Sequence, residues 1–216
     1  LSTNTITTGG KGRGYGILLN ISSLTNRVFN NSIIAKTNGS DNYGIYVVDT
    51  VLSNNISFNT VSTNGTSNNY GIFIRTTASN NTITQNTVTT AGNQTDNYGI
   101  YLLNFAQDNN VTLNTVTTYG TGSSRGMIVS SNSNRNALWR NVINTNNTGD
   151  FNYGIDVAVS LSINISSNVI LTNGSGSNNG IYLSGSVHNS TVYNNTVTSN
   201  GTGANNYGIR VSSGQD

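Results

Sequence analysis

The chain has 216 residues, of which 34% are hydrophobic and only 7% are charged, and its formal net charge is +2. It contains 41 Asn, 30 Thr and 27 Ser but no Glu, Pro or Cys. Its few scattered basic residues do not form a nucleic-acid track, the lack of Cys excludes disulfides and zinc-thiolate sites, and no apolar run is long enough to predict a membrane span. This composition favours strands and turns over helices.

Two markers recur along the whole chain. Glycine in a Tyr-Gly-Ile-like setting returns at intervals of 26 to 28 residues, at Gly16, Gly44, Gly71, Gly99, Gly126, Gly154, Gly180 and Gly208. An Asn followed two residues later by Val or Ile occurs at Asn4, Asn31, Asn59, Asn86, Asn114, Asn141, Asn168 and Asn195. A fixed period of this kind indicates a solenoid of stacked repeats.

Aliphatic pairs accompany both markers in every repeat. The two residues after each glycine are spaced by two, which is the period of a strand with one buried face. After each glycine the pairs are Ile17 and Leu19, Ile45 and Val47, Ile72 and Ile74, Ile100 and Leu102, Met127 and Val129, Ile155 and Val157, Ile181 and Leu183, Ile209 and Val211. Around each Asn they are Leu1 and Ile6, Val28 and Ile33, Ile56 and Val61, Ile83 and Val88, Val111 and Val116, Leu138 and Ile143, Ile165 and Ile170, Val192 and Val197.

These patterns predict an all-β fold, a parallel β-helix of about eight coils that forms a single domain over residues 1–216. The eight marker asparagines are then expected to form a structural amide ladder inside the turns. Units such as Asn81 to Val88, followed by NYGIYL segments, resemble the parallel β-helix repeat proteins of the pectin-lyase-like superfamily, including NosD-like surface proteins of archaea and bacteria. The resemblance covers the whole chain and implies that the helix is right-handed.

The acidic residues do not form a recognisable catalytic set. Asp41, Asp96 and Asp150 fall in one turn about two coils apart, which is too far for a close carboxylate pair, so we interpret them as turn residues. His188 has no spaced Ser or Cys partner. The sequence therefore predicts no catalytic, metal or cofactor site, and a protein that is not an enzyme.

Aromatic residues recur at two phases of the repeat. Tyr46, Phe73, Tyr101 and Tyr182 lie two residues after glycine and are expected to stack sugars or to pack a neighbouring rod. Tyrosines just before glycine are expected to form a packing ladder at a corner, at Tyr15, Tyr43, Tyr70, Tyr98, Tyr153 and Tyr207.

Fourteen Asn-x-Ser/Thr sequons make N-linked glycans expected covalent partners. Six are predicted to share a row of corresponding, solvent-facing turns: Asn38, Asn64, Asn93, Asn146, Asn173 and Asn200. The other eight are Asn20, Asn30, Asn55, Asn80, Asn110, Asn164, Asn189 and Asn194.

The main functional prediction is a structural, extracellular, glycosylated fibre or surface rod that stacks head to tail or continues in a longer chain. It follows from the ends, because Leu1 and Asp216 fall at complementary phases of the repeat and neither end shows a cap. A carbohydrate-binding or carbohydrate-active protein is the alternative. Ice binding is a second alternative, through a broken row of outward Thr-x-Thr pairs such as Thr87 and Thr89.

Overall fold

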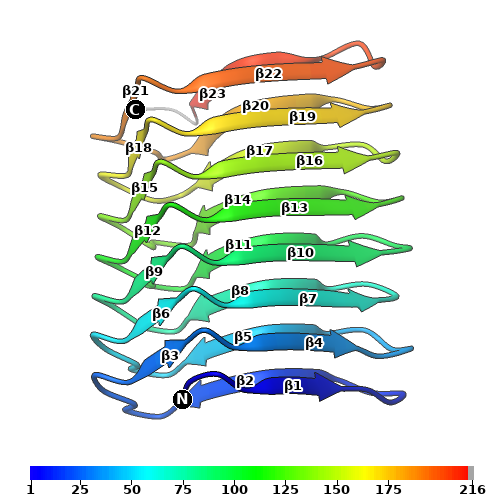
Figure 1. The fold of residues 1–216 in the computed structure, drawn as a ribbon. Coiled ribbons are helices and arrows are strands. Elements are labelled where there is room, and N and C mark those ends of the chain that lie inside the picture. Colours follow the sequence, from blue (N-terminus) through cyan, green and yellow to red (C-terminus); the bar gives the residue numbers. More distant parts are fainter. Residues whose placement is uncertain (214–216) are drawn as a thin grey trace.

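The computed structural model, which describes residues 1–213, is a stack of parallel coils (Figure 1). The predicted all-β parallel β-helix of about eight coils is confirmed. Within the described residues there is no helix, and hence none long and apolar enough to cross a membrane.

Each of the first seven coils contributes one strand to each of three parallel sheets, called A, B and C, and the last described coil contributes strands to sheets B and C. Sheet A contains β3 (Arg27–Phe29), β6 (Asn55–Ser57), β9 (Thr82–Thr84), β12 (Asn110–Thr112), β15 (Ala137–Trp139), β18 (Asn164–Ser166) and β21 (Thr191–Tyr193). Sheet B contains β1 (Thr5–Thr8), β4 (Ser32–Lys36), β7 (Thr60–Gly65), β10 (Thr87–Gly92), β13 (Thr115–Gly120), β16 (Val142–Asn147), β19 (Val169–Gly174) and β22 (Thr196–Gly201). Sheet C contains β2 (Gly14–Asn20), β5 (Asn42–Val48), β8 (Asn69–Arg75), β11 (Asn97–Leu103), β14 (Ser124–Ser130), β17 (Asn152–Ala158), β20 (Asn178–Gly185) and β23 (Tyr207–Ser213).

Like residues of successive repeats lie on top of one another. In sheet C, Ile45 pairs with Ile72 and Ile72 with Ile100, and in sheet B, Val61 pairs with Val88. The side chains of these columns are fully buried in one continuous core between the sheets. The aliphatic periodicity of the sequence is therefore the periodicity of the core.

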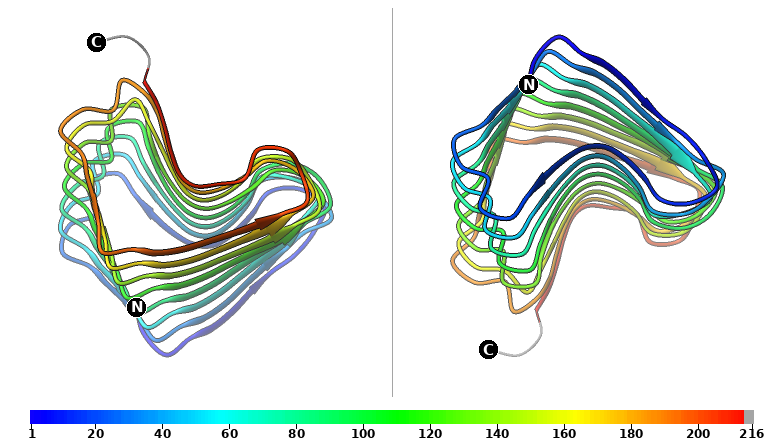
Figure 2. Two further views of the ribbon diagram at one scale, coloured as in Figure 1. Left: turned by 90° about the horizontal axis from the view of Figure 1, so that it is seen from above. Right: turned by 90° about the horizontal axis from the view of Figure 1, so that it is seen from below.

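Sheet B is nearly flat, whereas the strands of sheet C bow toward it, so that the backbone of sheet C is concave on its outer side (Figure 2). The glycine marker explains this shape. A Cβ added at Gly44 would lie 2.1 Å from Val61 Cγ1 and 2.6 Å from the Gly71 carbonyl oxygen. Only glycine allows the two sheets to approach this closely, and the outer surface is indented where they do.

The corner between sheets A and B turns through a left-handed backbone conformation in successive coils. The residue there has a φ of 53° to 58°. In most coils it is neither Asn nor Gly, the residues that adopt this left-handed conformation most readily. The column comprises Thr3, Asn30, Phe58, Gln85, Leu113, Arg140, Ser167 and Asn194. Each of these residues directly precedes a marker asparagine.

Candidate functional site: the concave face of sheet C

Two columns of side chains line the outer, concave surface of sheet C, which we call the concave face. One column lies directly before the glycine marker and comprises Tyr15, Tyr43, Tyr70, Tyr98, Arg125, Tyr153, Asn179 and Tyr207. The other lies two residues after it and comprises Leu18, Tyr46, Phe73, Tyr101, Ile128, Asp156, Tyr182 and Arg210.

Both columns point to the same side because the strand departs from strict alternation at the glycine. Gly44 and Ile45 are both buried against the core, so Tyr43 and Tyr46 emerge together on the outside. Their ring centroids are 4.9 Å apart and the planes differ by 17°. The sequence assigned these tyrosines to a corner and to a separate outward column, whereas they form one aromatic layer.

Over the first four coils this layer is packed against itself. The rings of Tyr15 and Tyr43 stack at 5.1 Å, those of Tyr46 and Phe73 at 5.3 Å, and those of Phe73 and Tyr101 at 5.0 Å. The rings of successive coils therefore stack face to face along the rod axis, and offset stacking of this kind stabilises aromatic pairs. Since burial raises the pKa of Tyr43 to about 12, its hydroxyl stays protonated at neutral pH.

The aromatic layer is interrupted in the fifth and sixth coils by an ion pair. Arg125 Nε lies 2.9 Å from Asp156 Oδ2. The guanidinium also lies over the rings of Tyr98 and Tyr153, 5.3 and 5.5 Å from their centroids. Arg125 Nη1 donates a hydrogen bond of 2.8 Å to the Tyr98 hydroxyl, which in turn donates to Asp96 Oδ1 at 2.5 Å.

Beside this ion pair lie polar atoms that have no hydrogen-bond partner within residues 1–213. Besides Arg125 Nε, whose contact with Asp156 Oδ2 is too poorly aligned for a hydrogen bond, they are Asp156 Oδ1 and both amide atoms of Asn179, which lies between Tyr153 and Tyr207 in its column. Asp156 is only 7% exposed and Asn179 is fully buried. Leaving such groups unpaired costs about 1–3 kcal/mol each, so a polar group admitted by a small movement of the neighbouring side chains would satisfy them. We call Arg125, Asp156 and Asn179 the polar cluster.

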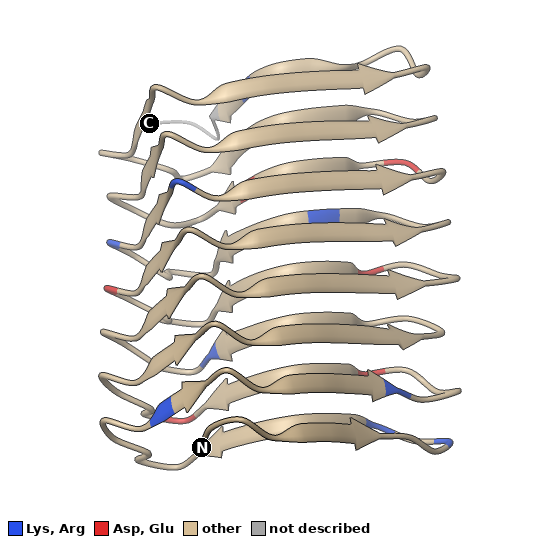
Figure 3. Ribbon diagram, in the orientation of Figure 1, with Lys and Arg blue, Asp and Glu red and all other residues tan. Residues whose placement is uncertain are grey.

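Burial sets the electrostatics of the polar cluster. It raises the pKa of Asp156 to about 6, because removal from water disfavours the carboxylate more strongly than Arg125 favours it. Beyond the cluster, the Arg210 guanidinium lies over the rings of Tyr182 and Tyr207 at 5.2 and 5.3 Å. Charged residues are few and scattered elsewhere on the rod (Figure 3).

Sequence reasoning missed the polar cluster, although a signal was present. Asp156 has the same phase as Tyr46 and Tyr101, and Arg125 has the same phase as Tyr98. The interpretation of Asp residues as turn residues therefore does not extend to Asp156, which lies within β17. Other aspartates form ion pairs at the edges of the rod, Asp41 with Arg13 at 2.9 Å and Asp108 with Arg135 at 2.7 Å.

The marker asparagines form one hydrogen-bonded column between sheets A and B. The side-chain Nδ2 of each donates to Oδ1 of the next at 2.9 to 3.1 Å, from Asn4 to Asn195. Two further ladders had not been foreseen. One runs through Asn54, Asn81, Asn109 and Asn136, and the other includes Asn42, Asn69 and Asn97, then Asn152, Asn178 and Asn206.

The remaining predicted residues are dispersed. Among residues 1–213 no three His, Cys, Asp or Glu side chains gather in a way suited to a metal ion, and His188 is exposed. The Thr-x-Thr pairs lie on sheet B in register with one another, but Val142 and Val169 interrupt them. Leu1 is 60% exposed at one end of the rod, and Asp216 lies outside the described residues.

Comparisons with known proteins show the fold and no closer relationship. No family model matches the chain, and no curated protein matches it. Two solved structures of variants of the periplasmic alginate epimerase AlgG, a right-handed parallel β-helix protein, are similar to it, with TM-scores of 0.56 and 0.57 and sequence identities of 20% and 19%. They cover 93% and 98% of this chain, which spans about half of theirs, 48% and 50%.

The comparison corrects one expectation. The sequence predicted that the protein is not an enzyme, but the solved structures similar to it are those of an enzyme. The prediction was wrong because it treated the absence of a carboxylate pair in the turns as the absence of any reactive group. It did not consider a carboxyl group buried on the concave face. What the chain shares with these proteins is the parallel β-helix fold.

Proposed function

We propose that the protein binds a polysaccharide along the concave face, with one sugar residue held by the polar cluster. The observation that carries this proposal is the group of buried, unpartnered atoms at Asp156 and Asn179, enclosed by tyrosines on the indented side of the rod. Sugar hydroxyls both donate and accept hydrogen bonds. They can therefore satisfy a carboxylate oxygen, an amide N–H and an amide oxygen together.

The shape of the face fits an extended ligand. Eight coils stacked at about 4.8 Å give a face of roughly 34 Å between its first and last strands. The side chains of Tyr15, Tyr43, Tyr46 and Tyr70 are each partly exposed on it, so a phenol recurs from coil to coil. Such a surface offers repeated hydrogen-bonding groups at a constant spacing, as a polymer of repeated units requires.

The comparisons support the carbohydrate-binding alternative more than the fibre. The similar structures are of a protein whose name states that it acts on alginate and is periplasmic. We propose correspondingly that this chain works outside the cytoplasm, in the cell envelope or beyond it. The structural rod and head-to-tail stacking stay predictions, which electron microscopy of the purified chain tests.

Binding is tested with a matched pair of carboxylate substitutions. Asp156→Asn and Asp108→Asn each replace an ion-paired aspartate by its amide, but only Asp156 lies in the polar cluster. Isothermal titration against alginate, a pectate and a neutral glucan should give binding to at least one of them. Asp156→Asn should weaken that binding roughly 10- to 100-fold, the value of a charged hydrogen bond, and Asp108→Asn should not change it.

A further pair of variants tests the location. Tyr101→Ala removes a ring of the concave face, and Tyr119→Ala removes a 44% exposed ring from the flat outer surface of sheet B. Only the first should weaken binding. Equal losses in both, or no binding to any of the three polysaccharides, would contradict the proposal.

Chemical modification of the bound sugar is a second candidate function, favoured by one observation. A carboxyl with a pKa of about 6 can both accept and release a proton near neutral pH. Nuclear magnetic resonance spectra of each polysaccharide before and after incubation would reveal a reaction. The reaction should disappear in Asp156→Asn and persist in Asp108→Asn.

A further inference from the structure

We propose that N-linked glycans coat the flat and edge surfaces of the rod, with a row at Asn64, Asn146, Asn173 and Asn200, and that this coat leaves the concave face bare. The first half concerns modification sites and is independent of ligand binding. The second half rests on the proposed polysaccharide site, because a face free of glycans has a role only if a ligand binds to it.

The structure divides the asparagines into two populations. All 14 sequon asparagines are exposed or partly exposed, whereas the ladder asparagines of the inner coils are buried. The cause is geometric. A marker asparagine such as Asn114 is followed two residues later by a core aliphatic residue, here Val116, so the hydroxyl required by a sequon cannot stand there.

The strand pairing of sheet B places four sequon asparagines in one column. Asn146, Asn173 and Asn200 pair directly in three successive coils, and Asn64 occupies the same column between Lys36 and Ala91. The sequence predicted that Asn38 and Asn93 belong to the same row, but they come two residues later than its column, in the turn itself.

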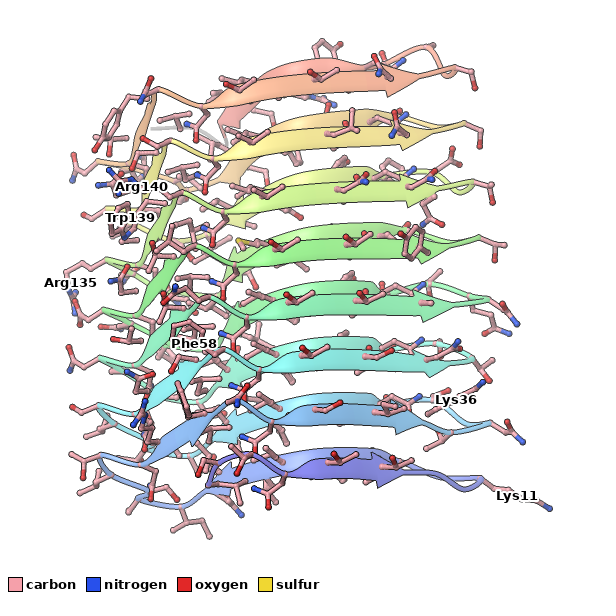
Figure 4. The ribbon with its side chains drawn as sticks, in the orientation of Figure 1. Lys11, Lys36, Phe58, Arg135, Trp139 and Arg140 are labelled. Atoms are coloured by element: carbon pink, nitrogen blue, oxygen red, sulfur yellow. The ribbon has the colours of Figure 1, made fainter. Side chains whose placement is uncertain are left out.

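The row lies where a glycan finds room. Asn64, Asn173 and Asn200 each come directly before the glycine that ends a strand of sheet B. At Asn64 the surface has an open hollow of about 180 Å³, which Asn38 and Asn93 also line. Lys11 and Lys36 extend freely into solvent from the same edge of the rod (Figure 4).

The other sequons avoid the concave face. Asn55, Asn110 and Asn164 point outward from sheet A, Asn30 and Asn194 occupy the left-handed corner, and Asn38, Asn80, Asn93 and Asn189 lie in turns. Sheet C contains a single sequon, at Asn20, the last residue of its first strand β2. A glycan there lies several coils from Asp156, so it leaves the polar cluster open.

Glycan occupancy is measured on protein secreted from an N-glycosylating host. Peptide-N-glycosidase in heavy-oxygen water converts each occupied Asn to a mass-labelled Asp, which peptide sequencing by mass spectrometry locates. At least three of the four row positions should carry the label. Thr148→Ala should remove the label at Asn146, and the matched Thr148→Ser should retain it. Unmodified asparagine at all four positions, or a label that persists in Thr148→Ala, would overturn the proposal.

The bare concave face is tested by adding a glycan to it. Tyr182→Asn creates a sequon with Leu183 and Ser184 on this face, and Tyr182→Gln is the control without a sequon. The added glycan should weaken polysaccharide binding at least tenfold beyond the control, whereas enzymatic removal of the natural glycans should change it less than twofold. Stronger binding after removal would contradict the second half of the proposal. Occupancy is read from mass alone, so absence of binding would count against the proposed function and not against the glycan row.

Discussion

One pair of residues shows how the interior accommodates an exception to the repeat. In the sheet C ladder, Ser124 stands where Asn97 and Asn152 stand in the neighbouring coils. At the end of β16, Asn147 stands where the neighbouring strands of sheet B have Gly120 and Gly174. The Asn147 side chain donates to Ser124 Oγ at 2.7 Å and so occupies the space that a ladder asparagine would fill. A Cβ at Gly174 would lie 2.1 Å from Asn152 Nδ2, so a full-length Asn at both positions cannot be accommodated.

This exchange predicts strong coupling between the two positions. Ser124→Asn alone should be destabilising because it clashes with Asn147, and Asn147→Gly alone because it leaves Ser124 without its partner and a cavity beside it. The double variant restores the ladder pattern and should recover most of the loss. A double-mutant cycle from urea unfolding should give a coupling free energy of about 1–3 kcal/mol, and additive effects would contradict the argument.

The raised pKa of Asp156 makes the stability of the folded protein depend on pH. A carboxyl group with a higher pKa in the folded state stabilises it fully below the unfolded pKa, which is about 4. That contribution is lost as the pH rises through the folded pKa, about 6. The Asp156 contribution to the free energy of unfolding should therefore fall between roughly pH 4 and pH 7, by on the order of 2–3 kcal/mol at most.

Comparison of two variants isolates that contribution. Asp156→Asn should remove this part of the pH dependence measured by urea unfolding, and Asp108→Asn at the exposed edge should leave it in place. An identical pH profile for the wild-type protein and Asp156→Asn would show that the carboxyl is not perturbed in this way.

The polar cluster was not predictable from alternation, and the reason lies in single residues. Positions three apart in a regular strand face opposite sides, so Arg125 and the column of Asp156 could not be assigned to one surface from the sequence. The consecutive inward positions at the glycine marker bring them together. The burial of Asn179 likewise depends on residues of the neighbouring coils, so the sequence of its own strand does not predict it.

At the scale of elements, amide ladders hold each coil in register with the next. Asn114 Nδ2 donates to Asn141 Oδ1 and to the Ile83 carbonyl oxygen, and Asn114 Oδ1 accepts from the backbone N–H and the side chain of Asn86. The ladder at the aliphatic marker was recognisable because its asparagines keep a fixed spacing to Val or Ile. The two others were obscured by the general abundance of Asn, although the repeated Asn-Tyr-Gly triplet carried the signal for the ladder that includes Asn42, Asn69 and Asn97.

Removal of a central rung should therefore be costly. Asn114→Ala leaves the donors of Asn86 and the Ile83 carbonyl buried without partners and should lower the free energy of unfolding by about 3–5 kcal/mol. Asn205→Ala, at an exposed loop position with no side-chain role in a ladder, should change it by less than about 0.5 kcal/mol. Similar losses in urea unfolding for both variants would show that the ladder adds nothing beyond a typical asparagine.

At the scale of the whole molecule, the fold followed from the sequence because every coil repeats the same aliphatic columns. Ile72, Ile100 and Met127 are buried in one column, as their phases required. The curvature of sheet C did not follow. It depends on how closely two sheets approach, and that distance is set by pairs such as Gly44 and Val61, which belong to different strands and different repeats.

Repetition also predicts that a whole coil can be removed. Deletion of Thr87–Asn114 joins Asn86 to Thr115, so that Thr60 faces Thr115 in the register it now has with Thr87. The shortened chain should fold, with a urea m-value lower by about one eighth because it buries about one eighth less surface. Deletion of Thr87–Gly99 alone removes a fraction of a coil, shifts all later columns and should abolish cooperative unfolding. Failure of the whole-coil deletion to fold would show that the coils are not interchangeable units.

The parallel pairing of each strand with its counterpart in the next coil also governs how the chain folds. Ladder contacts join residues 26 to 28 positions apart, so the first two coils to meet must close loops of that length before other contacts compensate for the lost entropy. Every later coil then adds to a template that already exists. Nucleation is therefore slow and elongation fast, and amide hydrogens of the central coils should exchange with solvent later than those of the terminal coils.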